Sequence, residues 1–427
     1  MTLLVTGGRV LRPDHTVERA DIRIDTDGRI EAVGDLDRTD RDQSLDASGA
    51  LVTPGLVNAH GHAAMTLLRG YADDKPLDAW LREDIWPMEA ALSGADIAAG
   101  ARLAAVEMIR SGTTAFADMY FHVPELVDVI AETGLRARVG HGVVTVGKDD
   151  ESAAADVREA LDVAAEYDGA ADGRVRTAVT PHAPHTVGTD AIETLVAGAR
   201  EHEVPLHFHF NETEAYLDPD ETGERPGAYA DRLGLLGESS WVAHGVHLTG
   251  EEIDQLADTD TAVAHCPASN MKLASGLAPV ERLREAGVTV ALGTDGAASN
   301  NDLDMFDEMR DAAMVGKLAA EDASAVPADA VVEMATQGGA EALGLPGGQI
   351  AEGEPADLAV VDLSGAHLTP EHDLVSHLAY AARGSDVRHT VCDGAVLMRD
   401  GELLTLDAER VKREAEERAR DLVERAS

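Results

Sequence analysis

Histidine and acidic side chains recur at the ends of short apolar runs in this 427-residue sequence. They are His60, His62, His207, His209, Glu212, His244, His265 and Asp295. A single histidine at the end of a strand usually has a structural role. Several histidines that share one face with an aspartate and a glutamate are hard to explain by packing. Imidazole nitrogens suit Zn²⁺ or Fe²⁺, so the pattern predicts a metal site.

The two His-x-His pairs supply most of the expected ligands. His60 and His62 are two residues apart, so on a strand their side chains leave from the same face. His207 and His209 share this spacing. We prefer His209 as the ligand because Glu212 then follows at the edge of the site, whereas His207 is expected to lie deeper as a buried, hydrogen-bonded residue. The expected ligand set is His60, His62, His209 and Asp295.

This set accepts Zn²⁺, Fe²⁺ or Mn²⁺, and zinc is the first expectation. A second metal would need a bridging anion, commonly a modified lysine or a glutamate on the fourth strand. Residues 174–182 contain neither, and Lys148 lies in an acidic segment. The sequence therefore predicts one divalent metal per chain, with an open coordination position for water.

The segment that must position these groups, residues 51–348, alternates apolar runs with alanine-rich helical segments. The runs cover residues 51–60, 113–119, 135–140, 174–182, 204–210, 240–245, 261–267 and 288–295. Eight strands that alternate with helices are typical of a (β/α)8 barrel, which carries its chemistry at the carboxyl ends of the strands. We therefore expect an α/β protein with a TIM barrel as its catalytic domain.

The two ends of the chain, residues 1–50 and 349–427, predict strands that are not separated by helices. Asp393-Gly394 and Asp400-Gly401 predict hairpin turns. We expect the two ends to join as one small β-sandwich beside the barrel. Residues 408–426 are expected to form a charged amphipathic helix that caps the surface.

Five segments carry a family resemblance. They are PGLVNAHGHAAMTLLRG, HFHFNET, WVAHGVHLT, HCPASNMKLASGLAPV and LGTDGAASNNDLDMFDEMR. They resemble the amidohydrolase superfamily and, within it, the 5-methylthioadenosine/S-adenosylhomocysteine deaminases. The Asp295-Gly-Ala-Ala-Ser-Asn-Asn run and Pro-Ala-Ser-Asn-Met-Lys-Leu are more specific to the deaminase and chlorohydrolase branch. The resemblance runs nearly end to end and implies a distorted (β/α)8 barrel with one divalent metal, usually zinc.

By this resemblance the ligands fall on the four residues named above, Glu212 on the proton shuttle and His244 on the residue that polarises the attacked centre. The metal would lower the pKa of its water from ~15.7 to ~7. Asp295 would accept the first proton, and Glu212 would deliver a proton to ring N1 and help the amine to leave. The implied reaction is hydrolytic deamination of an adenosine-type nucleoside to the inosine-type product and ammonia. His247 and His265 are expected to be supporting or structural residues.

The resemblance also implies a substrate pocket. Trp80 would cover the apolar 5′ region from a lid after the first strand, and Glu89 would accept hydrogen bonds from the ribose hydroxyls. His182 would touch the nucleoside. His141 is also a candidate substrate contact, and it stands where relatives that favour S-adenosylhomocysteine place an arginine for the carboxylate. Because no arginine stands there to pair with the carboxylate, adenosine, 5′-deoxyadenosine and 5′-methylthioadenosine stay open as alternatives to S-adenosylhomocysteine.

The composition limits the partners and the compartment. The 79 acidic and 35 basic residues give a net charge of −44, and there are only five lysines. No basic stripe is available for nucleic acid or an anionic membrane. Such dispersed acidity fits a protein that stays soluble in high intracellular salt. The two cysteines, a short apolar N-terminus and the absence of a long apolar run favour a cytoplasmic protein, and a homo-oligomer is expected.

Three rival interpretations stay open at this point. The first is a metal hydrolase for another heterocycle, such as guanine or a chlorinated triazine. The second is a scaffold without activity. The presence of every expected metal ligand argues against it. The third is an acidic mimic of DNA, which rests on the net charge alone.

Overall fold

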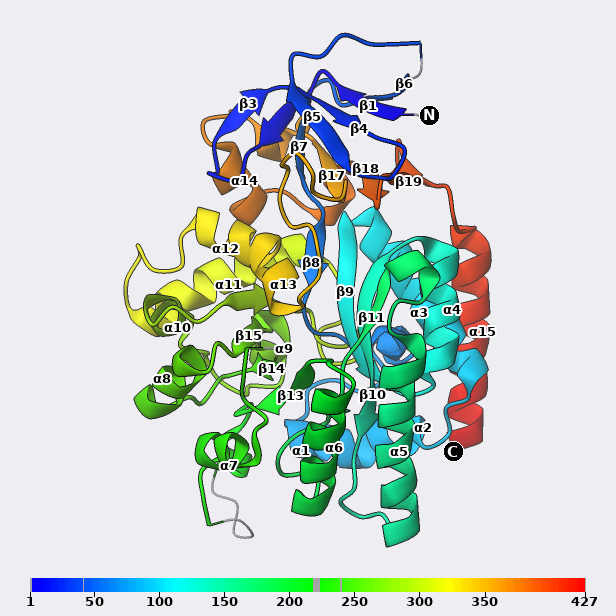
Figure 1. Ribbon diagram of the computed structural model, residues 1–427, viewed down its shortest axis with the longest axis vertical. Coiled ribbons are helices and arrows are strands. Elements are labelled where there is room, and N and C mark those ends of the chain that lie inside the picture. Colours follow the sequence, from blue (N-terminus) through cyan, green and yellow to red (C-terminus); the bar gives the residue numbers. More distant parts are fainter. Residues whose placement is uncertain (1, 41, 218–222, 239, 427) are drawn as a thin grey trace.

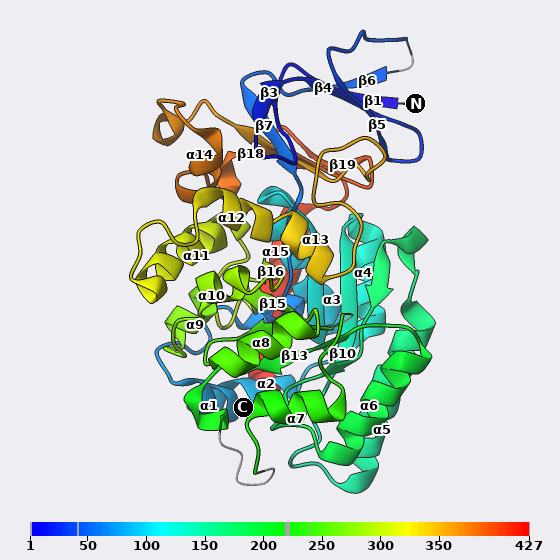
Figure 2. The same ribbon diagram turned by 60° about the vertical axis from the view of Figure 1, so that its left-hand side comes forward.

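The computed structural model describes residues 2–40, 42–217, 223–238 and 240–426. It places a β-sandwich on one end of a parallel barrel (Figures 1 and 2). The barrel strands in the described chain are β8 (Leu56–Asn58), β9 (Thr113–Tyr120), β10 (Arg136–Val143), β11 (Val175–Thr177) with β12 (Thr180–Pro181), β13 (Leu206–Phe210), β14 (Ser240–His244), β15 (Ala262–His265) and β16 (Val290–Leu292). The predicted α/β fold with a (β/α)8 barrel is confirmed.

The barrel closes through backbone hydrogen bonds between two half-sheets, which have the orders β11-β10-β9-β8 and β13-β14-β15-β16. At one seam the Ala59 N–H donates to the Leu292 carbonyl at 2.8 Å. At the other, the His207 N–H donates to the Val179 carbonyl at 3.1 Å. The long strands β9 and β10 are buried along their whole length, as expected of parallel strands that are covered on both faces. The division of the fourth strand into β11 and β12 distorts the barrel.

Helices surround the barrel strands. They are α3 (Gly94–Arg110), α4 (Val123–Thr133), α5 (Asp150–Tyr167), α6 (Thr189–Glu201), α7 (Pro226–Leu233), α8 (Gly250–Asp258), α9 (Pro267–Lys272), α10 (Val280–Glu285), α11 (Met305–Ala320), α12 (Ala328–Met334) and α13 (Gln337–Ala342). The chain between β8 and α3 forms a lid from α1 (Leu77–Trp80), a π-helical turn (Leu81–Ile85) and α2 (Trp86–Glu89). Its residues overhang the carboxyl ends of the strands, where the predicted site lies.

The β-sandwich combines both ends of the chain, as predicted. Its strands in the described chain are β1 (Thr2–Thr6), β2 (Arg9–Leu11), β3 (Val17–Arg19), β4 (Asp21–Ile24), β5 (Ile30–Gly34), β6 (Asp42–Asp46), β7 (Ala50–Pro54), β17 (Leu358–Asp362), β18 (Val387–Cys392), β19 (Ala395–Arg399) and β20 (Glu402–Leu403). Strand β7 lies between β2 and β17, so residues of the two ends are neighbours in one sheet. Asp393-Gly394 and Asp400-Gly401 have positive φ and form the predicted turns.

The strand predicted over residues 51–60 is interrupted at Gly55. Residues 50–54 form β7 in the sandwich, and residues 56–58 form β8 in the barrel. A Cβ atom at Gly55 would lie 2.1 Å from the Thr114 hydroxyl oxygen, so a side chain there would collide with β9. Gly55 therefore lets the chain pass closely from one domain to the other.

The last helix, α15 (Ala408–Ala426), forms where it was predicted, and a second C-terminal helix, α14 (Leu374–Tyr380), precedes it. Figure 1 shows α15 along the side of the barrel beside α3, and the two helices are in contact. Its apolar side chains Val411, Ala415 and Leu422 are buried. Arg425 Nη2 lies 2.6 Å from the buried carboxylate of Asp96 on α3. The helix is thus packed along one face and exposed along the other.

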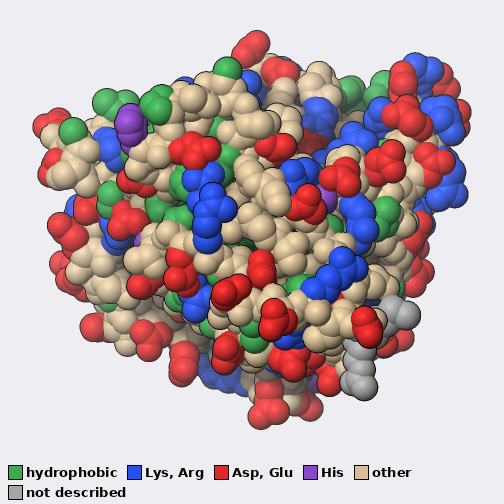
Figure 3. Space-filling model, turned by 90° about the horizontal axis from the view of Figure 1, so that it is seen from above, with side chains coloured by type: hydrophobic (Ala, Val, Ile, Leu, Met, Phe, Trp, Pro, Cys, Tyr) green, Lys and Arg blue, Asp and Glu red, His purple; other side chains and the backbone are tan. Residues whose placement is uncertain are grey.

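Acidic side chains are numerous on the face of the molecule that is shown in Figure 3. In the face shown in Figure 3 they are spread across the view and interspersed with basic side chains. Among the described residues, no helix has the length and apolar character needed to cross a bilayer.

Candidate metal centre and active site

The predicted site residues meet at the carboxyl ends of the barrel strands. His60 and His62 follow β8, His209 is the penultimate residue of β13, and His244 ends β14. Asp295 follows β16 and has a φ of +62°. This is the end of a (β/α)8 barrel at which active sites are found.

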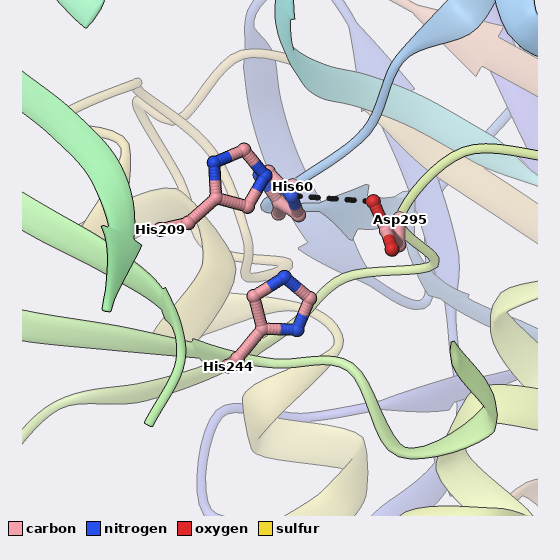
Figure 4. A group of neighbouring side chains, drawn as sticks. All are labelled: His60, His209, His244 and Asp295. Carbon is pink, nitrogen blue, oxygen red and sulfur yellow. Dashed lines mark ion pairs between the residues drawn. The ribbon is translucent and has the colours of Figure 1, made fainter. Parts of the chain in front are cut away.

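Four of these side chains form a compact group. One ligand atom from each lies within 4.8 Å of the others in the set His60, His209, His244 and Asp295. Figure 4 shows the three imidazoles directed toward a common space, with the carboxylate opposite His60. The structure thus includes His244 in the compact group. His62, the fourth ligand expected from the sequence, lies beside it, with Nε2 3.2 Å from Asp295 Oδ1.

The hydrogen bonds of His60 show which nitrogen faces the centre. His207 Nδ1 lies 2.9 Å from the Trp241 carbonyl, which can only accept, so His207 carries its proton on Nδ1. His207 Nε2 then accepts from His60 Nδ1 at 2.8 Å. This leaves a lone pair on His60 Nε2, a buried atom without a hydrogen-bond partner among the described residues. An unpartnered nitrogen beside a carboxylate fits a metal ligand.

His62 and His209 are oriented in the same way. His62 Nδ1 donates to the Met119 carbonyl at 2.7 Å, and His209 Nδ1 donates to the His182 carbonyl at 2.7 Å. Each ring therefore presents Nε2 to the centre. Outward Nδ1–H bonds to backbone carbonyls are the usual support for histidines that bind metals. The donor set fits one divalent metal ion.

The electrostatics of the group agree with this assignment. Burial lowers the pKa of His60 to about 4 and that of His209 well below its ordinary value, so both rings are neutral, as metal binding requires. Burial alone would raise the pKa of Asp295, but the adjacent imidazoles of His60 and His62 hold it well below its ordinary value. Burial opposes charge on His62 too, yet its contact with Asp295 raises its pKa to about 9. Metal binding at His62 must therefore displace a proton.

Glu212 lies at the rim of the group, as predicted. Its Oε2 is 3.9 Å from His244 Nε2. Burial raises the pKa of the Glu212 carboxyl above its ordinary value. A carboxyl group that keeps its proton to higher pH is suited to donate one to a substrate.

A cavity of about 690 Å³, its mouth included, opens above these residues. Its lining includes Trp80, Trp86 and Glu89 from the lid, Tyr120 and Phe121 after β9, and His62, His182, His209, Glu212, His244 and Asp295. Trp80 is buried, and its Nε1–H donates to the Ala72 carbonyl at 3.0 Å. The structure therefore brings the predicted contacts Trp80, Glu89 and His182 to one cavity with the catalytic candidates.

His141, predicted to contact the substrate, is not among the residues that line this cavity. Gly142 and Val144 face the cavity, and because side chains alternate along a strand, His141 faces away from it. Its Nε2 lies 3.0 Å from Asp156 Oδ1, on α5. The sequence indicated the strand but not which face of it His141 occupies.

The structure also shows orienting residues that the sequence did not assign. His207 is buried as predicted, but it also fixes the ring of His60, and it stacks on Trp241 with ring centroids 4.2 Å apart. The alternation in His207-Phe208-His209 was the one sequence signal for it. Asp118 accepts the Ala63 N–H at 2.6 Å and so holds the turn after His62. No motif pointed to Asp118.

The barrel, the imidazole and carboxylate group and the cavity above it define a metal-dependent hydrolase. The chain belongs to the amidohydrolase family, because the sequence model of that family matches residues 51–397. It is 66% identical to the 5-methylthioadenosine/S-adenosylhomocysteine deaminase of Halobacterium salinarum over 402 aligned residues. The alignment covers 93% of each chain. It is 45% identical over 402 residues, again 93% of each chain, to a 5′-deoxyadenosine deaminase of Methanothermobacter thermautotrophicus.

Among solved structures, the chain is similar to a zinc-bound adenosine deaminase from Xanthomonas campestris, with a TM-score of 0.92 and 36% identity over 99% of this chain and 98% of that one. The family resemblance predicted from the five sequence segments is confirmed. The prediction of high-salt adaptation is consistent with a relative from Halobacterium salinarum.

Proposed function

We propose that this chain removes the 6-amino group of an adenosine-type nucleoside by hydrolysis, giving the inosine-type nucleoside and ammonia. The observation that carries the proposal is the position of Glu212, a largely buried carboxyl group with a raised pKa, beside His244 and the candidate metal ligands at the base of the cavity. The candidate substrates are 5′-methylthioadenosine, S-adenosylhomocysteine, 5′-deoxyadenosine and adenosine.

The proposed ligands are His60, His62, His209 and Asp295, and the proposed metal is Zn²⁺. When bound, such a metal supplies Lewis acidity and lowers the pKa of water. Asp295 accepts the first proton from the water that attacks C6. Glu212 donates a proton to ring N1 and then helps to protonate the exocyclic amine, which leaves as ammonia, and His244 contacts the attacked centre. Proton transfer from a positioned carboxyl is typically worth ~10²–10⁴-fold in rate.

The substrate contacts follow from the lining of the cavity. Glu89 accepts hydrogen bonds from the ribose hydroxyls, Trp80 covers the 5′ region, and His182 contacts the nucleoside. The ribose contact favours a nucleoside over the second candidate, hydrolysis of guanine or a triazine, because those substrates have no hydroxyl pair for Glu89.

The segment after β10 offers little for an amino-acid carboxylate. Asp156 lies 3.0 Å from His141 Nε2 and 2.7 Å from Lys148 Nζ, so one carboxylate holds both of these groups. A substrate carboxylate placed there would have to compete with Asp156. We therefore expect small 5′ groups to be accepted at least as well as the homocysteine group.

The test is ammonia release and the adenine-to-hypoxanthine absorbance change in high salt with zinc restored. The panel is the four nucleosides, adenine, guanine and atrazine. Glu212→Gln should lower kcat by ~10²–10⁴-fold and keep one equivalent of metal. Glu214→Gln, an exposed neighbour, is the matched control and should match the wild type. Turnover of guanine or atrazine without any nucleoside would favour the second candidate.

We also propose that the protein acts in the cytoplasm as a homo-oligomer, without nucleic acid or membrane partners. Cys266 and Cys392 are both buried free thiols, which supports a reducing compartment. Light scattering in high salt measures the oligomeric state.

A further inference from the structure

The short helix α9 follows β15 and carries Ser269 and Asn270 of the Pro-Ala-Ser-Asn-Met-Lys motif. The proposed reaction gives this motif no role. Both side chains are buried, and each contacts a different group at the reacting centre. Lys272 fixes the helix, because its Nζ lies 2.7 Å from Asp73 Oδ1 and 3.0 Å from the Ala298 carbonyl oxygen.

Ser269 holds one oxygen of Asp295. Its hydroxyl donates to Asp295 Oδ2 at 2.7 Å, and the Ser299 hydroxyl donates to the same oxygen at 2.7 Å. The other oxygen, Oδ1, lies 3.4 Å from His60 Nε2 and 3.2 Å from His62 Nε2. The two carboxylate oxygens therefore have different partners: Oδ2 accepts from the two hydroxyls, and only Oδ1 faces the imidazoles.

Asn270 holds His244. Its Oδ1 lies 2.9 Å from His244 Nδ1. An amide oxygen only accepts, so the proton of the neutral ring is on Nδ1 and the lone pair is on Nε2. Nε2 is the atom that lies 3.9 Å from Glu212. The bond therefore sets both the tautomer of His244 and the direction in which its ring faces.

We propose that Ser269 and Asn270 are positioning residues for the deamination, and that α9 fixes Asp295 and His244 relative to each other. This inference rests on the proposed function. Asp295 acts on the water that attacks C6, and His244 contacts C6 itself. An error in their relative placement should therefore lower the rate of the chemical step more than the affinity for the substrate. Since Asp295 is a proposed metal ligand and His244 is not, only Ser269 should affect metal affinity.

The experiment compares Ser269→Ala and Asn270→Leu with the wild type. Each should lower kcat of the zinc-loaded enzyme by about 10–100-fold with KM unchanged. Ser269→Ala should also weaken zinc binding about 10-fold in a chelator competition, whereas Asn270→Leu should leave it unchanged. Ser269→Thr and Asn270→Asp keep the donor and the acceptor and should restore most of kcat. Met271→Ala changes an exposed side chain of α9 and serves as the control.

Wild-type kcat in both variants would overturn the proposal. So would a loss that Met271→Ala shares or that thermal unfolding explains. A fall in zinc affinity with Asn270→Leu at unchanged kcat would make His244 a ligand and overturn its assigned role. If the wild type deaminates no nucleoside, the proposed function fails, and unchanged zinc affinity in Ser269→Ala then overturns this inference separately.

Discussion

The neutral rings at the centre depend on residues that do not touch it. His60 presents Nε2 because His207 accepts its Nδ1–H, and His207 does so because the Trp241 carbonyl fixes its own proton. The Trp241 carbonyl thus sets the tautomer of the candidate ligand His60 through the intervening ring of His207. Such outer contacts are a large part of metal affinity in proteins.

Replacement of His207 should therefore weaken metal binding without removing a ligand. His207→Phe keeps an aromatic ring against Trp241 but loses the acceptor for His60. We expect metal affinity to fall about 10–100-fold, measured by chelator competition. His202→Gln, at an exposed histidine, is the control. Equal affinity in His207→Phe and the wild type would show that His60 keeps its tautomer unaided.

Glu89 should make nucleoside binding depend on pH. Burial raises its pKa to about 7, although Tyr120 and His62 oppose the shift. Below that pH the carboxyl is protonated, and above it the carboxylate accepts from both ribose hydroxyls. KM for 5′-methylthioadenosine should therefore fall as pH rises from about 6 to about 8.

Glu89→Gln should raise KM and remove this pH dependence, because the amide stays neutral. Glu83→Gln lies in the same lid but at an exposed position and should keep the wild-type profile. A pH-dependent KM that survives in Glu89→Gln would assign the titration to another group.

At the scale of elements, the lid shows how a helix can present a wide face. Leu77, Trp80, Leu81, Trp86 and Glu89 all line the cavity. The step of five residues from Leu81 to Trp86 matches the wider π-helical turn over residues 81–85. Pro87 has no N–H to donate, which favours an interruption of the regular helix just before it.

The junction of α3 and α15 should contribute to stability. Asp96 accepts from the Ser93 N–H at 2.9 Å and from Arg425 at 2.6 Å, so one buried carboxylate caps α3 and holds α15. Asp96→Ala should cost about 1–2 kcal/mol in the free energy of unfolding by urea. Glu417→Ala, on the exposed face of α15, should stay within about 0.5 kcal/mol of the wild type. A similar small effect for Asp96→Ala would show that α15 packs without this contact.

The elements were easier to predict than the contacts between them. The eight barrel strands follow from apolar runs with helical segments between them, and the candidate ligands follow from their places at strand ends. The position of His141 did not follow, because adjacent residues of a strand face opposite sides. The tautomers of His60 and His244 depend on His207 and Asn270. His207 lies on β13 and Asn270 on α9, each on a different element from the histidine that it orients. No local pattern encodes such a contact.

At the scale of the whole molecule, the net charge of −44 should make the fold dependent on salt. Repulsion among exposed acids acts over ~10 Å at 0.1 M salt but only ~3 Å at 1 M, so added salt relieves it. Tm should rise when potassium chloride is raised from ~0.1 M to ~1 M, and deamination should rise with it. Scanning calorimetry measures the first and ammonia release the second. Full stability and activity in dilute buffer would contradict the prediction.

The place of β7 has a consequence for how the chain is made. Residues 50–54 pair with residues 358–362, and the whole barrel lies between them in the sequence. The ribosome therefore releases the first half of the sandwich long before its partner strands exist. Until then β7 has an open edge, which is the kind of surface that other nascent chains can join. The order of synthesis therefore delays closure of the sandwich until the whole barrel segment has been made, so the edge of β7 stays open throughout that time.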